Sequence, residues 1–147
     1  MFCCDLEPIV VPSPEAKRLN TLLKFIACGH ILFAILYFVG GTYFALGFAE
    51  LVFAFVIYLT YSTYYYFYIA IYTWLLALCC IIPIINIGSF IQYSNKFFDE
   101  LEWKYIYMLI VFSMILIFYG FALYITYRSY KEFKALFMVL FEEVNLQ

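Results

Sequence analysis

The sequence predicts an all-α integral membrane protein: a bundle of four transmembrane helices followed by an amphipathic C-terminal tail helix. Its 147 residues are 68% hydrophobic and the mean hydropathy is +0.97, far above the usual composition of soluble globular domains. Between Lys24 and Lys96 the only formally charged side chain is Glu50. Since roughly twenty apolar residues cross a bilayer core of about 30 Å, this stretch fits three passes. A second apolar run, 105–127, adds a fourth.

Composition excludes several classes of protein. Four passes leave too few residues for a separate soluble catalytic domain, so the chain forms one membrane domain. A net charge of -2 with eight basic residues provides no basic surface for nucleic acid. Five cysteines and one histidine show no zinc spacing, and no nucleophile elbow, phosphate loop or paired catalytic carboxylates occur. We therefore expect no catalytic residues, no metal and no cofactor.

The first element is an extended cytoplasmic arm, residues 1–13, whose prolines disfavour helix. Cys3 and Cys4 lie in this arm and are candidate sites of S-palmitoylation, the alternative being two unmodified thiols. Ser13 and Pro14 then suit the cap and the first position of a helix, which we expect over 14–39.

Three further helices are expected over 43–61, 67–91 and 105–127, which complete a transmembrane domain spanning 14–127. Gly40 and Gly41 predict a tight connection before the first of them. Pro83 predicts a kink in the second, because proline lacks the N–H that would bond the carbonyl of Cys79. A charged loop precedes the last helix.

Glu50 is the sharpest functional candidate, because a carboxylate deep in a bilayer is costly unless it finds a partner. Counting 1.5 Å per residue places Asn86 and Ser113 at a similar depth, which predicts an intramembrane polar cluster of these three residues. His30 enters from the opposite side and is expected to be too distant for contact. The cluster is either a proton or ion path or a structural hydrogen-bond cluster, and we expect the structural role.

Small residues recur every fourth position along the second helix, at Gly41, Ala45 and Ala49. This pattern allows two helices to approach closely. It indicates either a dimer face or packing against another helix of the same chain, and we expect the latter.

The tail, residues 128–147, spaces apolar side chains by three and four residues, which predicts an amphipathic helix on the cytoplasmic leaflet or on a neighbouring subunit. Its interface residues are Tyr130, Phe133, Phe137 and Leu140. The segment from Tyr130 to Phe133 also fits the tyrosine-based pattern that vesicle-coat adaptors bind. Lysine and arginine near both ends of the chain predict that both termini are cytoplasmic.

The segment Gly40-Gly41-Thr-Tyr-Phe-Ala-Leu-Gly47-Phe-Ala resembles the Gly-Gly turn and small-residue helix of secretory carrier membrane proteins, which are small vesicle tetraspans, as are the COPI-associated Golgi tetraspans. The basic aromatic segment that carrier proteins place between their second and third helices is missing here. The resemblance implies a multi-pass protein of endomembranes or vesicles.

Three functions follow from these observations. The first is a non-enzymatic tetraspan that organises or shapes an endomembrane by lateral assembly, with lipid, itself or other membrane subunits as its partners. One alternative is an accessory subunit of a large membrane complex, such as a proton pump or respiratory assembly. The other is a small transporter that uses Glu50.

Overall fold

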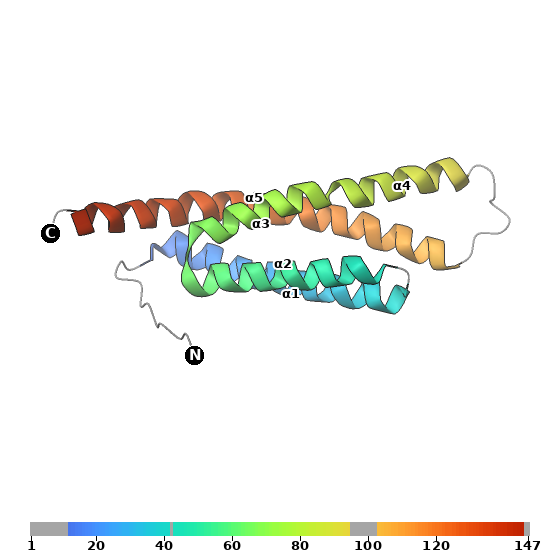
Figure 1. Cartoon of the computed structure of the whole chain (residues 1–147), viewed down its shortest axis with the longest axis horizontal. Coiled ribbons are helices and arrows are strands. Elements are labelled where there is room, and N and C mark those ends of the chain that lie inside the picture. The colour runs from blue at the N-terminus through green and yellow to red at the C-terminus, as the bar shows by residue number, and fades with distance from the viewer. Residues whose placement is uncertain (1–11, 42, 95–102, 146–147) are drawn as a thin grey trace.

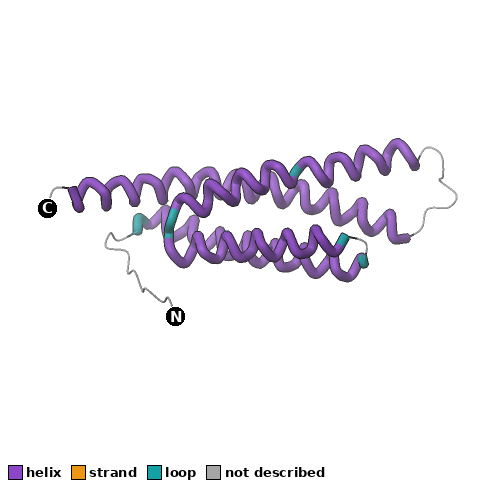
Figure 2. The backbone as a smooth tube through the Cα atoms, in the orientation of Figure 1, coloured by secondary structure: helices purple, strands orange, loops and turns teal. Residues whose placement is uncertain are grey.

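The computed structural model describes residues 12–41, 43–94 and 103–145, and all regular structure in these ranges is helical. The helices run close to parallel along one long axis, in two layers (Figure 1). Helices α1 and α2 form one layer, and α3, α4 and α5 form the other. Figure 2 shows how short the described connections between the helices are. The candidate palmitoylation sites Cys3 and Cys4 lie outside the described residues.

Helix α1 (Pro14–Gly40) begins where the sequence predicts. The Ser13 hydroxyl accepts a hydrogen bond from the Ala16 backbone N–H at 3.0 Å, and Pro14 occupies the first helical position. The helix ends at the expected turn, where Gly41 adopts a left-handed conformation with φ of 66° that other residues rarely tolerate. Helix α2 (Phe44–Thr63) then returns alongside α1.

The close approach of α1 and α2 occurs at Gly47, which is buried. A Cβ atom at this position would lie 2.7 Å from the ring of Phe38, so a larger residue would require either that ring or the two helices to shift. The predicted stripe does not occupy this contact. Gly41 belongs to the turn, Ala45 is exposed, and Ala49 is only half-buried. The sequence pattern therefore identified the correct helix but placed its tight contact on the wrong face.

The third crossing is made of two helices, α3 (Tyr66–Cys79) and α4 (Ile81–Ser94). The break confirms the distortion predicted from Pro83, which lies in the first turn of α4 and lacks the N–H that would bond the Cys79 carbonyl. The hydrogen bond that closes the end of α3 lies just before Pro83, where the Cys80 backbone N–H donates to the Leu76 carbonyl at 3.0 Å. Cys79 and Pro83 both face the pocket described below.

Helix α5 (Trp103–Asn145) is continuous for 43 residues, with no break at Tyr127. Its second half packs on the connection between α2 and α3 of the same chain instead of lying apart as a tail. Phe133 is fully buried, and the centre of its ring lies 5.1 Å from that of Tyr64. The ring centres of Phe137 and Tyr66 lie 5.3 Å apart. Tyr130 also contacts Tyr66, at 5.8 Å. The side chain of Leu140 lies outside the described residues.

Four helical segments in the described residues are long and apolar enough to cross a membrane, which agrees with the number of apolar helices expected. They comprise α1, α2, the α3–α4 pair over Tyr66–Ser89, and Ile106–Val139 of α5. In its most apolar stretch α1 has 39% of its residues buried, whereas the α3–α4 segment has 22%. The α3–α4 segment is thus the part of the bundle that the chain covers least.

Candidate functional site

A buried polar network joins four helices near the middle of the bundle. His30 of α1 lies with Nδ1 2.5 Å from Oε2 of Glu50 on α2, and with Nε2 2.6 Å from the hydroxyl of Tyr72 on α3. The Tyr119 hydroxyl of α5 donates a short hydrogen bond to Oε1 of Glu50. Each helix layer therefore contributes two members to one continuous chain of hydrogen bonds.

Apolar rings surround the imidazole end of the network. His30, Glu50, Tyr72 and Tyr119 are all buried. The imidazole of His30 lies 5.0 Å from the ring of Phe118 and 5.4 Å from that of Phe53. In such surroundings hydrogen bonds are strong, and a polar group left without a partner is costly.

The expectation that His30 is too far from Glu50 is wrong. The depth of Glu50 was counted from one membrane boundary and that of His30 from the opposite one. The turn at Gly40 and Gly41, however, fixes how α1 and α2 align. His30 lies ten residues before Gly40 and Glu50 nine residues after Gly41, so the two side chains meet at one level. Counting outward from the turn would have found the pair.

The predicted cluster of Glu50, Asn86 and Ser113 does not form. Asn86 is half-buried; it accepts from the Tyr43 hydroxyl at 3.4 Å, and its Nδ2 donates to the Ile82 carbonyl. Ser113 is exposed and donates to the Leu109 carbonyl of its own helix. Depth in the membrane alone therefore does not predict contact, because Asn86 and Ser113 lie on helix faces that do not meet Glu50.

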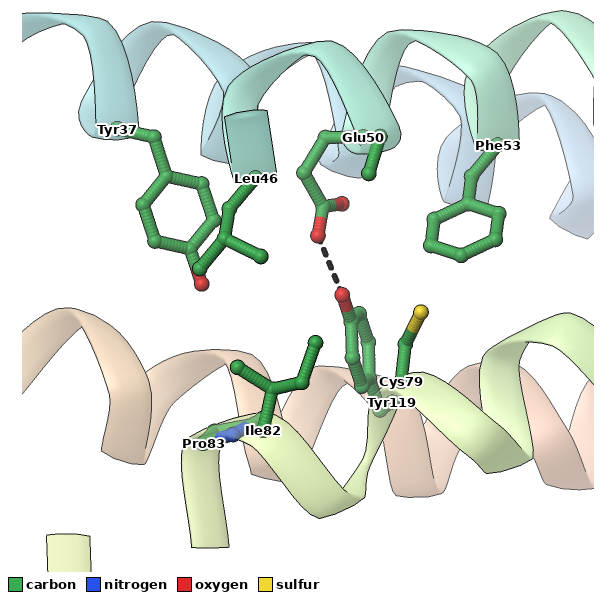
Figure 3. A pocket seen from close by; sticks show the side chains of 9 residues that line it. Tyr37, Leu46, Glu50, Phe53, Cys79, Ile82, Pro83 and Tyr119 are labelled. Atoms are coloured by element: carbon green, nitrogen blue, oxygen red, sulfur yellow. Dashed lines mark hydrogen bonds between the residues drawn. The ribbon is translucent and has the colours of Figure 1, made fainter. Parts of the chain in front are cut away.

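A small pocket adjoins Glu50 at the break between α3 and α4 (Figure 3). It is small, with a cavity volume of about 10 Å³, which is roughly the room that one water molecule needs, and part of it is open to the surroundings. Figure 3 shows Tyr37 and Glu50 pointing from the α1–α2 layer toward Tyr119 and Cys79 of the other layer. Its lining residues are Tyr37, Leu46, Ala49, Glu50, Phe53, Cys79, Ile82, Pro83 and Tyr119.

The chemistry available at this site is that of proton donors and acceptors. Within the described ranges, no group of three or more histidine, cysteine, aspartate or glutamate side chains is placed to hold a metal ion. The network instead joins a carboxyl, an imidazole and two phenol hydroxyls in hydrogen-bond contact. Such a chain can fix the helices in one arrangement and can also exchange protons along its length.

The fold and the site together define a class: an all-helical chain with four apolar helices of membrane-spanning length around a buried polar centre. No protein-family pattern, curated protein or solved structure matches the chain. The resemblance to vesicle tetraspans therefore depends on the segment from Gly40 to Ala49 alone.

Proposed function

We propose that this chain is a multi-pass membrane protein without enzymatic activity that organises an endomembrane by lateral assembly. The observation that carries the proposal is the apolar outer face of the α3–α4 segment, the part of the bundle least covered by its own chain. Trp74 on this face is 72% exposed. It is joined there by the exposed side chains of Leu78, Ile81, Ile84 and Ile85.

The polar interior supports the same function. Glu50 and His30, the ionisable pair in the middle of the bundle, find their partners within the chain. Their hydrogen bonds, together with those of Tyr72 and Tyr119, thus join four helices and leave the outer faces apolar. Outer faces of this kind suit lipid and neighbouring membrane helices. The accessory-subunit alternative makes the same use of these faces and differs in the identity of the partner.

The orientation proposed has both ends of the chain in the cytoplasm. Basic side chains from the start of α1 and the second half of α5 gather at one end of the bundle, where Arg128 lies 2.6 Å from Glu15. These residues are Lys17, Arg18, Lys24, Arg128, Lys131 and Lys134. Lysine and arginine near membrane ends favour the cytoplasmic side. The resemblance to vesicle tetraspans supports an endomembrane as the location.

An adaptor contact through Tyr130 and Phe133 has less support. Both residues belong to the continuous helix α5, and the side chain of Phe133 is fully buried against Tyr64. An adaptor would reach this side chain only after the helix had separated from the α2–α3 connection. Lateral assembly through α3 and α4 requires no such change.

Native mass spectrometry of the full chain released from lipid nanodiscs tests this function. We expect oligomers or complexes with other membrane subunits, and we expect Trp74→Ala combined with Ile85→Ala to reduce them to monomer. Phe55→Ala on α2 is the matched control, because Phe55 is 59% exposed but lies on the other layer. A wild-type monomer in native membrane extracts would contradict the proposal, as would equal loss of assembly in the control.

A further inference from the structure

The hydrogen-bond network can be satisfied completely in one charged arrangement. If Glu50 is ionised, its Oε2 accepts from His30 Nδ1–H and its Oε1 accepts from the Tyr119 hydroxyl. The other imidazole nitrogen, Nε2, then accepts from the Tyr72 hydroxyl. Every proton in the network has one acceptor, and the network carries one negative charge.

A negative charge at this depth is costly because apolar rings surround it and none of the four side chains is exposed. One added proton removes the charge. Two atoms can accept that proton while the network stays connected: His30 Nε2 and Glu50 Oε1. The two choices differ in which tyrosine hydroxyl must reverse its direction.

Protonation of His30 Nε2 would turn the Tyr72 hydroxyl away from the imidazole. Tyr72 is fully buried, and among the described residues its hydroxyl makes no second hydrogen bond. Its proton would therefore be left without an acceptor, which is unfavourable in an apolar interior. The same arrangement would also create an imidazolium beside a carboxylate, at the cost of desolvating two charges.

Protonation of Glu50 Oε1 avoids both costs. The carboxylic acid would donate to the oxygen of Tyr119, and the Tyr119 hydroxyl would turn toward the pocket that it lines. This pocket also holds the hydroxyl of Tyr37 and the thiol of Cys79, and it is partly open to the surroundings. The side of the network that faces Tyr119 therefore has room for a reversed hydroxyl, whereas the side that faces Tyr72 does not.

We propose that Glu50 is a reversible proton-binding site loaded from the pocket at the α3–α4 break through the hydroxyl of Tyr119. A hydronium ion in the pocket gives a proton to the Tyr119 oxygen, while Tyr119 passes its own proton to Glu50 Oε1. The products are water, a neutral Tyr119 and a carboxylic acid. The titratable groups facing Glu50 are His30 and Tyr37 from α1, Tyr72 and Cys79 from α3, and Tyr119 from α5. The site goes beyond lateral assembly and does not depend on it.

Infrared spectroscopy of the full chain in lipid nanodiscs tests the proposal. Ordinary exposed carboxyl groups are ionised near neutral pH, so a C=O stretch of a protonated carboxyl there reports a buried acid. We expect one such band near neutral pH, shifted when water is replaced by D2O and absent from Glu50→Gln. A wild-type spectrum without this band overturns the proposal.

The route of the proton is tested by Tyr119→Phe, which retains the carboxyl group and removes the relay. We expect the band to persist and its exchange with D2O to slow by about tenfold or more. Tyr107→Phe is the matched control on the same helix, because the Tyr107 hydroxyl donates to the Leu36 carbonyl outside the pocket. Exchange as fast in Tyr119→Phe as in Tyr107→Phe overturns the route.

The location of the proton is tested on His30, the single histidine of the chain. With ¹⁵N-histidine labelling, nuclear magnetic resonance observes one imidazole and reports which of its nitrogens carry hydrogen. We expect hydrogen on Nδ1 alone under the conditions in which the carboxyl band is present. A second N–H on Nε2 under those conditions would place the proton on His30 and overturn the assignment to Glu50.

Discussion

The middle of the bundle and its basic end both join α1 to α5, but they do so by opposite means. In the middle, His30, Glu50 and Tyr119 form short polar contacts in a fully buried setting. At the basic end, an apolar ring contact between Phe133 and Tyr64 accompanies an ion pair between Arg128 and Glu15 that is partly exposed.

The difference indicates that burial decides how much a polar contact contributes to the stability of the fold. The pairs His30–Glu50 and Arg128–Glu15 have nearly the same length, 2.5 Å and 2.6 Å. The first is enclosed, so losing one partner leaves the other stranded. The second is screened by water and ions, so losing one partner changes little. Stability at the basic end should instead come from the buried ring of Phe133.

The largest effect is expected from His30→Leu, which leaves Glu50 without its imidazole partner. The substitution strands two buried groups, the Glu50 carboxyl and the Tyr72 hydroxyl, and each buried polar group that loses its partner costs about 1 to 3 kcal/mol. Unfolding of the purified protein in detergent by increasing sodium dodecyl sulfate measures the cost. The double variant His30→Leu, Glu50→Leu should regain part of the loss, since the carboxyl is then gone while the Tyr72 hydroxyl still lacks its acceptor. A double variant less stable than the single one would contradict this comparison.

An intermediate effect is expected from Phe133→Ala at the basic end. Loss of the fully buried ring leaves a cavity against Tyr64 and should cost about 3 kcal/mol. The same unfolding titration measures the total, and hydrogen exchange locates the loss in the second half of α5. Met138→Ala, at a half-exposed position of the same helix, is the control. If the control loses as much stability, Phe133 does not anchor this end.

The smallest effect is expected from Arg128→Gln, which removes the ion pair with Glu15. Because both side chains are substantially exposed, we expect no measurable change in the unfolding midpoint at physiological salt. Repeating the measurement at low salt sharpens the comparison, since screening is then weaker. A loss as large as that of His30→Leu would show that burial is not what separates the two regions.

Local chemistry made the helices predictable from the sequence. Ser13 and Pro14 mark the start of α1, Gly41 marks its end, and Pro83 marks the break between α3 and α4. Each of these residues restricts its own backbone or caps its neighbours, so the signal needs no knowledge of the fold. The isolated charge of Glu50 likewise identified the centre of the network.

The partners of Glu50 were harder to predict because they depend on how separate helices rotate and align. Tyr72 and Tyr119 are two of sixteen tyrosines, and nothing in the local sequence distinguishes them. Asn86 and Ser113 lay at a suitable depth but on the wrong faces. His30 was the exception, since its position relative to the Gly41 turn contained the information needed to pair it with Glu50.

The length of α5 gives the molecule a mechanical property. At 43 residues this helix is about 65 Å long, roughly twice the thickness of a bilayer core. Tyr119 lies beside the pocket, and Asn145 lies about 39 Å further along the same continuous helix. A tilt of about 5° around Tyr119 would displace that far end by about 3 Å. Small rearrangements around Glu50 would thus be passed along α5 to the contact between Phe133 and Tyr64, which holds its second half.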